Sequence, residues 1–278
     1  MQFGTLVQYL APQKTLSRIV RAATRWTFRP WKNFLIHRVV RRYRVDMSEA
    51  AQPDSRAYES FNAFFTRALR EDARRADGDA ASIASPVDGR ISQIGNVEAG
   101  RILQAKGRRY TVAELLADER AAAPYHDGSF VTLYLSPRDY HRVHMPLEGE
   151  LVETVHVPGR LFSVAPGPVA DIPRLFARNE RLICHFEGAH GPFVVALVGA
   201  MLVSGITTVW SGAEVPPYAR SVSRHDWRGH GIRPARFAEM GRFEMGSTVI
   251  VLLPSSGRFD TSFASEARIQ LGKRLGHL

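Results

Sequence analysis

The chain has 278 residues, of which 45% are hydrophobic, so it can bury a substantial core and is not disordered as a whole. Its single cysteine, Cys184, cannot form an intramolecular disulfide, so nothing favours a disulfide-stapled secreted fold, and a reducing compartment is the simpler interpretation. A net charge of +10 can indicate nucleic-acid binding, but its distribution along the chain changes that interpretation.

The excess positive charge lies at the N-terminus. Residues 1–45 contain ten of the 37 Lys and Arg residues and no Asp or Glu, so 27 basic and 27 acidic residues remain in the rest of the chain. The body of the protein is therefore neutral. The ten basic residues are Lys14, Arg18, Arg21, Arg25, Arg29, Lys32, Arg38, Arg41, Arg42 and Arg44.

Large apolar residues lie between these basic residues and predict an amphipathic helix. Four of them recur at i, i+3, i+4 and i+8, which places them on one helical face: Trp31, Phe34, Leu35 and Val39. Pro30 is suited to the first turn of this helix. A cationic helix with an aromatic face suits the surface of an anionic bilayer, where each basic residue contributes about 1 kcal/mol. No run approaches the ~18 apolar residues of a spanning helix, so we expect residues 1–45 to lie on a membrane as a basic arm.

Three other interpretations fit a basic, apolar N-terminus. It could pack on the domain, act as an organelle transit peptide, or bind nucleic acid. We favour the membrane surface because phosphate binding alone does not require so many apolar neighbours. No nucleic-acid partner is therefore expected.

The rest of the chain predicts one more helix and then a β-rich body. Residues 58–70 carry an apolar helical face, and residues 71–84, rich in Ala, Asp and Arg, are predicted to form a connector. Short strands separated by Gly and Pro are predicted at residues 90–97, 130–135, 151–157, 181–186, 193–198, 201–210 and 247–253, and short helices at 112–117 and 172–177. The expected class is α+β, with N-terminal amphipathic helices followed by a mainly antiparallel β core that is sandwich-like or barrel-like.

Three polar segments lie between the predicted strands: residues 85–90 (SPVDGR), 136–146 (SPRDYHRVHMP) and 241–248 (GRFEMGST). Catalytic groups tend to lie on loops held by a rigid scaffold. Each segment has an ordinary explanation, since Asp-Gly is a turn signal, Gly-Ser-Thr can open a strand, and the two histidines do not match the H-E-x-x-H zinc pattern. Together they supply an acid, an imidazole and a hydroxyl, which are the groups of an activated nucleophile.

In this order the three segments resemble those of the phosphatidylserine decarboxylases. Further similarities cover nearly the whole chain, in residues 61–67 (FNAFFTR), 157–164 (VPGRLFSV), 175–181 (LFARNER), 197–200 (LVGA) and 208–210 (TVW). The sequence departs from the usual family pattern at two positions. Met245 replaces a usual Leu, which keeps the apolar bulk and leaves the Gly-Ser bond intact, so processing is expected to proceed. Ala165 replaces a common Asn, which could alter a hydrogen bond near the substrate.

The resemblance implies a precursor that cleaves itself. It assigns Asp88, His144 and Ser247 as the self-cleavage triad, in which His144 takes the serine proton and Asp88 orients the imidazole. Ser247 would attack the carbonyl of Gly246, whose lack of a Cβ suits a strained approach. The products would be a β chain of residues 1–246 and a 32-residue α chain of residues 247–278 that begins with a pyruvoyl group.

This covalent pyruvoyl group, derived from Ser247, is the implied cofactor, and no metal is expected. It would form a Schiff base with the amine of phosphatidylserine and accept electrons as carbon dioxide leaves, giving phosphatidylethanolamine. His141 is the candidate for positioning the substrate or for protonating the carbanion, because a neutral-pH acid is needed. A structural histidine in a Pro-bounded loop is the alternative.

The implied partners are phosphatidylserine, an anionic membrane surface and the two chains of one precursor, and a homodimer is left open. We expect a peripheral protein on the cytoplasmic face of a bacterial cell membrane, with an arm at 1–45 and a catalytic domain at 46–278. Three alternatives remain. They are a membrane-bound serine hydrolase that uses Asp88, His144 and Ser247 without self-cleavage, a zinc enzyme with His141 and His144 as ligands, and a non-catalytic membrane-binding module.

Overall fold

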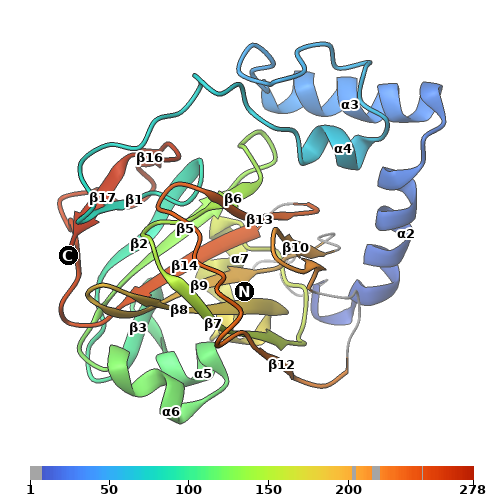
Figure 1. The fold of residues 1–278 in the computed structure, drawn as a ribbon. Coiled ribbons are helices and arrows are strands. Elements are labelled where there is room, and N and C mark those ends of the chain that lie inside the picture. Colours follow the sequence, from blue (N-terminus) through green and yellow to red (C-terminus); the bar gives the residue numbers. More distant parts are fainter. Residues whose placement is uncertain (1–7, 202–204, 215–219, 246) are drawn as a thin grey trace.

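The computed structural model describes residues 8–201, 205–214, 220–245 and 247–278. It combines N-terminal helices with a β-rich body, so the predicted α+β class is confirmed. In Figure 1, α3 (Arg29–Tyr43) and α4 (Phe61–Phe65) lie over the upper end of the body, and α2 (Gln13–Arg25) runs down one side. Within the described ranges, no helix is long and apolar enough to cross a membrane.

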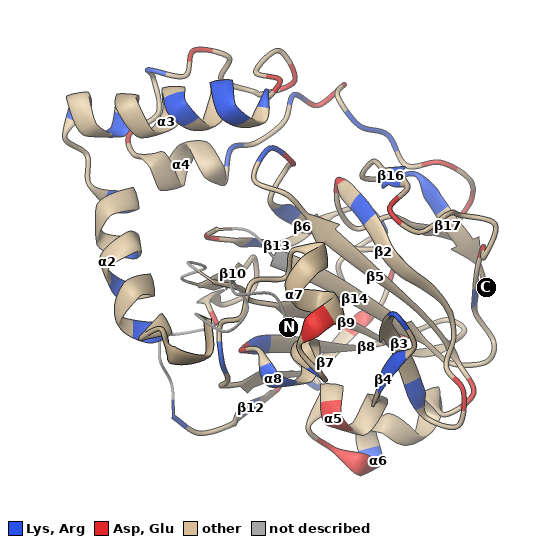
Figure 2. Ribbon diagram, turned by 180° about the vertical axis from the view of Figure 1, so that it is seen from behind, with Lys and Arg blue, Asp and Glu red and all other residues tan. Residues whose placement is uncertain are grey.

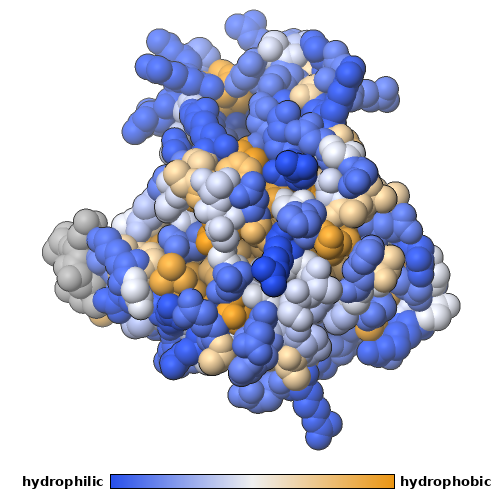
Figure 3. All heavy atoms as spheres, turned by 90° about the vertical axis from the view of Figure 1, so that its left-hand side faces the viewer, coloured by the Kyte–Doolittle hydropathy of each residue, from blue (hydrophilic) through white to orange (hydrophobic). Residues whose placement is uncertain are grey.

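Helix α3 is the central element of the arm. It has Pro30 in its first turn, as predicted, and ends at Tyr43, followed by its C-cap Arg44, whose φ of 54° is left-handed. Its inner side packs on α4, where Ile36 forms a small core cluster with Val45 and the three phenylalanines of α4. Figure 3 shows the outer surface here, with hydrophilic side chains over the upper end and hydrophobic ones beneath, where the arm meets the body.

The predicted apolar face of α3 divides between two environments. Leu35 and Val39 pack against the cluster with α4. Phe34 remains 56% exposed and lies 6.3 Å, ring to ring, from Trp31, which in turn neighbours Trp26. The outer aromatic residues are therefore available for a contact outside this chain.

The helix predicted at 58–70 is shorter in the structure. Helix α4 begins at its N-cap Ser60, whose Oγ accepts a hydrogen bond from the Ala63 amide, and it ends at Phe65. Beyond it, Ala68 and Arg70 exchange backbone hydrogen bonds with residues 49–51, and this pairing replaces further helical turns. The prediction was wrong at its C-terminal end because a long-range pairing competes with local helix propensity.

The body contains sheets in which all pairs between the named strands are antiparallel. The largest has eight strands, in the order β12 (Ser223–Asp226), β7 (Glu150–Val157), β8 (Arg181–Gly188), β9 (Gly191–Val198), β14 (Ser247–Leu253), β5 (Ser129–Leu135), β2 (Gly89–Asn96) and β16 (Arg268–Ile269). A four-stranded sheet has the order β11 (Gly212–Ala213), β10 (Ile206–Thr208), β13 (Glu239–Phe243) and β6 (Arg142–His144). Two smaller sheets are β1 (Ser82–Ala84), β17 (Arg274–His277) and β15 (Arg258–Phe259), and β3 (Arg101–Ala105) with β4 (Arg108–Thr111).

The eight-stranded sheet is buried on both faces, which β14 shows directly. Val249, Val251 and Leu253 contribute to one core cluster, and Ile250 and Leu252 contribute to the other. Side chains alternate across a strand, so a run of five apolar residues fills both cores. The strands predicted at 90–97, 130–135, 151–157, 181–186, 193–198 and 247–253 are found within two residues of their expected bounds.

Short helices cover the second of these clusters: α5 (Val112–Leu116), α6 (Glu119–Ala122), η1 (Ala123–Tyr125), α7 (Pro166–Asp171) and α8 (Leu175–Arg178). The helix predicted at 172–177 begins three residues late, as α8 at Leu175, because Ile172 is extended before Pro173 and separates α7 from α8. Of the strand predicted at 201–210, the structure has Ile206–Thr208, and residues 202–204 lie outside the described ranges.

Candidate active site

Strand pairing brings the three polar segments of the sequence together at one end of the body. Asp88 immediately precedes β2, the histidines lie in and beside β6, and Ser247 opens β14. Strand β5 pairs with β2 on one side, Tyr134 opposite Arg90, and with β14 on the other, Leu135 opposite Ser247. Strand β6 pairs with β13, which leads towards Ser247. The strand pairing therefore places the three polar segments near one another.

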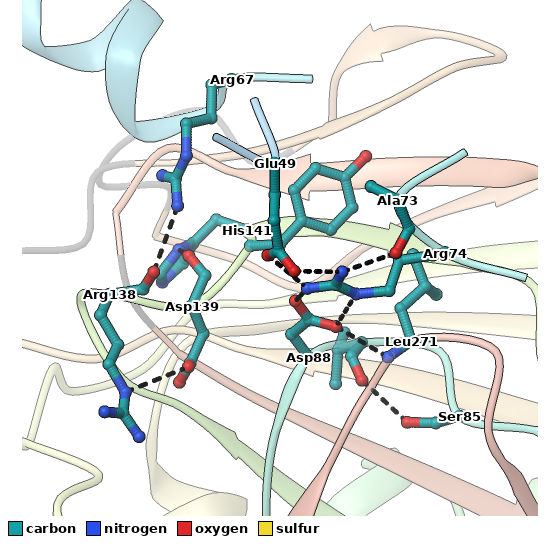
Figure 4. A network of polar contacts seen from close by, with 12 residues as sticks. Glu49, Arg67, Ala73, Arg74, Ser85, Asp88, Arg138, Asp139, His141 and Leu271 are labelled. Atoms are coloured by element: carbon teal, nitrogen blue, oxygen red, sulfur yellow. Dashed lines mark hydrogen bonds and ion pairs between the residues drawn. The ribbon is translucent and has the colours of Figure 1, made fainter. Parts of the chain in front are cut away.

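Asp88 is held in a network of charges that Figure 4 shows in close-up. Its two carboxylate oxygens accept hydrogen bonds from Arg74 at 2.9 and 2.6 Å, and the Leu271 amide donates to Oδ1 at 2.8 Å. The same guanidinium binds Glu49 at 2.8 Å, and these two carboxylates raise the pKa of Arg74. Within the described residues, no hydrogen bond joins Asp88 to His144. The Asp88 charge thus acts on the imidazole from a distance in this structure.

Gly89 explains why the Asp-Gly step is more than a turn signal. A Cβ at this position would lie 2.4 Å from the Tyr134 carbonyl oxygen, which is backbone and cannot move aside easily. Only glycine allows the end of β2 to approach β5 this closely. The position of Asp88 beside the end of β5 depends on that approach.

His144 has a defined tautomer. Its Nδ1 lies 2.7 Å from the Phe237 carbonyl oxygen, which can only accept, so Nδ1 carries the proton and donates it. Nε2 is then an acceptor, and it lies 3.2 Å from the Tyr140 hydroxyl. Burial lowers the pKa of His144 below 6.5, although the Phe237 hydrogen bond opposes this shift. The imidazole is therefore a neutral base with its lone pair on Nε2.

His141 lies in a fully buried position after a tight turn. Asp139 closes this turn by accepting hydrogen bonds from the Ser136 amide and hydroxyl at 2.7 and 2.6 Å. The Nδ1–H of His141 donates to the Asp139 carbonyl at 2.8 Å, and the Phe65 ring lies 4.0 Å away, centre to centre. Its Nε2 is buried and has no hydrogen-bond partner in the described part of the chain.

The environment of His141 favours one of its two predicted roles. Burial, reinforced by the charge of Arg67, lowers the pKa of His141 to about 3. The side chain is therefore neutral at pH 7 and holds no spare proton for a carbanion. A neutral imidazole with a free Nε2 acceptor fits substrate positioning better than proton donation, and its role stays a prediction.

Gly246, on one side of the predicted cleavage site, lies outside the described residues. Ser247 is placed by its backbone at the start of β14, opposite Leu135. Asp88 and Ser247 thus lie on two sides of β5, and neighbouring strands are separated by about 4.8 Å. The predicted triad contact with the Ser247 hydroxyl stays a prediction.

An apolar cavity of about 270 Å³ adjoins the start of β14. Leu135, the strand partner of Ser247, and Met245, two residues before it, both line this cavity. Val39 and Phe65 close it from the arm side, and Ala165 lies in its wall. The Ala165 position thus faces an apolar space, where the asparagine common in relatives would place a polar group.

Comparisons with known proteins agree with this arrangement. A model of the family described as phosphatidylserine decarboxylase matches residues 61–277, and one described as PSD matches residues 3–44. A phosphatidylserine decarboxylase proenzyme of Xanthomonas euvesicatoria pv. vesicatoria is 56% identical over 277 residues, with 99% of each chain covered. The proenzyme of Stenotrophomonas maltophilia is 54% identical, with both chains covered in full.

The chain belongs to the phosphatidylserine decarboxylase family. It is therefore a decarboxylase enzyme, and the resemblance inferred from its motifs is confirmed. Across the described residues of this decarboxylase, no three His, Cys, Asp or Glu side chains gather where they could hold a metal ion.

Sequence reasoning missed three residues of this candidate site. Arg74, which binds Asp88, lies in the segment predicted to be a connector, and no sequence pattern marks a buried ion pair between residues 14 positions apart. Phe237 contributes a backbone carbonyl, which every residue has, so its identity carries no signal. Tyr140, by contrast, belongs to the 136–146 segment. Its hydroxyl is a signal in the sequence for a hydrogen-bond partner of a nearby histidine.

Proposed function

We propose that the chain is a precursor that cleaves its own Gly246–Ser247 bond, converts residue 247 into a pyruvoyl group, and decarboxylates phosphatidylserine to phosphatidylethanolamine. The substrate and product follow from the names of the relatives, and the word proenzyme in those names agrees with processing. The family motifs Asp88, His144 and Gly246-Ser247-Thr248 are present in the family order.

The state of His144 is the observation that carries the proposal. General-base catalysis requires a neutral imidazole whose acceptor nitrogen faces the proton to be removed. The Phe237 carbonyl fixes the proton on Nδ1, and burial keeps the ring neutral at pH 7. Asp88 favours the imidazolium through its charge once the proton has been taken.

Self-cleavage can be written with these residues, a base that accepts the Cα proton of residue 247, and one water molecule. The Ser247 hydroxyl loses its proton to His144 Nε2 while its oxygen attacks the Gly246 carbonyl carbon, and the peptide C–N bond breaks to give an ester and a free amine on residue 247. Loss of the Cα proton of residue 247 then expels the Gly246 carboxylate, which ends the β chain. The dehydroalanine that remains takes up water and releases ammonia, leaving a ketone.

The surroundings of Ser247 fit a small ketone that receives a lipid amine. The apolar cavity begins beside it, and the buried His141 Nε2 lacks a partner in the described residues. A pyruvoyl group supplies an electron sink for the carbon–carbon bond that breaks. The protein's part is to orient the substrate and to exclude water from the reaction.

The arm supports action on a lipid surface. Of the nine large apolar side chains exposed in the described residues, seven belong to residues 10–43, including Leu10 at 82%, Ile19 at 61% and Trp26 at 56% exposure. Figure 2 shows Lys and Arg along α2 and α3, where no acidic residue occurs. Exposed aromatic residues beside cations suit the headgroup region of an anionic bilayer. We infer a peripheral position on the cytoplasmic face of a bacterial membrane.

The intact mass of the purified protein tests the proposal directly. We expect two chains, with a 32-residue α chain that resists Edman sequencing because its first residue has no amine. The Ser247→Ala variant should remain a single full-length chain and release no carbon dioxide from phosphatidylserine. A full-length, uncut wild-type chain that is active as a decarboxylase would refute the proposed processing, and an uncut chain that hydrolyses esters would favour the serine hydrolase.

A further inference from the structure

A polar cavity of about 530 Å³ lies next to Asp88, between the end of α3, the 138–140 segment and β16. We propose that this cavity binds the phosphodiester of the phospholipid substrate, with Arg138 and Arg67 as the main partners and Arg44 and Arg268 at the rim. This assignment rests on the proposed function, and it names the headgroup site that the catalytic motifs do not identify.

The charges around the cavity do not balance. Four carboxylates and six cations line it. The cations are Arg44, Arg67, Arg74, Arg138, Arg268 and Lys273. Arg74 is committed to Asp88 and Glu49, and Lys273 pairs with Asp77. Arg138 reaches Asp139 only at 3.6 Å, and that carboxylate already closes the 136–139 turn. Within the described chain, the other three guanidinium groups contact no carboxylate.

Arg67 is the cation with the least compensation. Its residue is 4% exposed, its Nη2 donates to the Arg138 carbonyl at 3.1 Å, and its Nε and Nη1 have no hydrogen-bond partner among the described residues. Figure 4 shows Arg67 extending from the α4 side towards the backbone of Arg138. The Arg67 guanidinium carbon lies 5.2 Å from the centre of the Phe64 ring, which compensates the charge only in part. Because no carboxylate pairs with this buried cation, an anion in the cavity would complete the site. Guanidinium groups match the paired oxygens of a phosphodiester.

The neighbouring apolar cavity identifies the anion as part of a lipid. At three places the chain lines the apolar cavity and then, one or two residues later, lines the polar one: Tyr43 and Arg44, Phe65 and Arg67, and Pro137 and Arg138. A diacyl phospholipid has the same juxtaposition, because its acyl chains are linked to its phosphodiester through glycerol. A free phosphate would need only the polar cavity.

The test measures kinetics on phosphatidylserine with short acyl chains dispersed in neutral detergent micelles, where membrane charge plays no part. We expect Arg138→Gln to raise KM about tenfold or more while kcat changes less than twofold, because a charged hydrogen bond is lost from substrate binding. The matched control is Arg258→Gln, which replaces an exposed arginine on β15 that does not line the cavity and should leave KM unchanged. Arg67→Lys, which keeps the charge and loses the fork, should also raise KM.

Soluble inhibitors distinguish a lipid phosphodiester from free phosphate. Glycerophosphoethanolamine should inhibit the wild type competitively and should lose this effect in Arg138→Gln, whereas equimolar inorganic phosphate should inhibit little. Inhibition by inorganic phosphate alone would show a free-phosphate site and overturn the assignment. Processed, active Arg138→Gln protein with an unchanged KM would also overturn it. Wild-type protein that neither cleaves nor decarboxylates would instead refute the proposed function, and the cleaved α chain of each variant shows that it has folded.

Discussion

The arm and the β body are stabilised in opposite ways. In the body, strands such as β14 are buried on both faces, and sequence-distant residues are fixed by register. In the arm, Gln8 and Gln13 accept hydrogen bonds from the Ser163 and Leu161 amides, and Arg25 forms an ion pair with Glu244. The exposed Arg25 pair can exchange with water or headgroups at little cost, whereas the buried sheet cannot.

This difference separates two tasks within one chain. The body fixes the groups that we propose to react, because His144 and Ser247 belong to paired strands. The arm carries most of the exposed aromatic and aliphatic side chains, yet it also touches the site through Val39 and Tyr43, which line the apolar cavity. Changes in the body should therefore abolish chemistry on any form of the substrate, and changes on the outer arm should weaken only the action on bilayers.

The largest effect is expected from the histidines of the body. His144→Ala should leave an uncut precursor, because no other neutral imidazole is assigned to take the Ser247 proton. His141→Ala should still be cut but should turn over phosphatidylserine poorly, on micelles and vesicles alike. Denaturing electrophoresis and carbon dioxide release measure the two steps separately.

The double variant Asp88→Ala with His144→Ala serves as the control for this pair. Members of one catalytic unit are not additive, so it should process scarcely worse than either single variant. Normal cleavage in His144→Ala, or a stalled precursor in His141→Ala alone, would show that the two histidine roles are exchanged.

The next effect concerns stability, and it contrasts a buried ion pair with an exposed one. Arg74→Gln leaves Asp88 and Glu49 unpaired, and the Arg74 and Asp88 side chains are only 9% and 11% exposed. We expect a loss of about 3 kcal/mol in the free energy of unfolding, measured with urea in the uncut Ser247→Ala background. The matched control is Arg70→Gln. Its pair with Asp72 is 55% and 64% exposed, so its loss should lower the free energy of unfolding far less. Equal losses in the two variants would contradict the structural role of Arg74.

The sequence was sufficient for the parts of this molecule that depend on local pattern. The buried strands and the start of α3 at Pro30 follow from periodicity and proline chemistry. The C-terminal end of α4 and the Arg74 pair depend on partners distant in the chain, which no local pattern encodes. The hydrogen bond that fixes His144 comes from a backbone carbonyl, so side-chain identity could not predict it. The triad of Asp88, His144 and Ser247 stays a prediction from motif resemblance, because contacts among these side chains depend on tertiary structure.

Acid should lower the stability of the body through His141. The unfolded chain protonates its histidines near pH 6.5, whereas the pKa of folded His141 is about 3, so the unfolded state binds more protons between these values. Stability is therefore full above pH 6.5 and falls as the pH drops, by about 2 kcal/mol from this one group at pH 5. Between pH 7.5 and pH 5, the free energy of unfolding in urea should fall less in His141→Gln than in the protein that keeps His141. Identical drops would contradict the buried, neutral state of His141.

The smallest effect is expected on the outer face of the arm. Phe34 is 56% exposed and packs only loosely on Trp31, so its ring is free to enter the headgroup region. Losing about 1.5 kcal/mol of apolar burial in Phe34→Ser should weaken binding to anionic vesicles about tenfold. The matched control is Val222→Ser, which removes a residue of similar exposure, 48%, from the body and should leave vesicle binding unchanged.

Two further measurements make the arm prediction specific. Turnover of micellar phosphatidylserine should be the same in Phe34→Ser and the wild type, because the residue lies outside both cavities. Raising the salt concentration should weaken vesicle binding in both proteins, since the arginines of the arm act through screened charge over about 8 Å at physiological ionic strength. If Phe34→Ser bound vesicles as tightly as the wild type while Val222→Ser did not, the membrane-facing surface would lie on the body. The arm's aromatic residues would then need another partner.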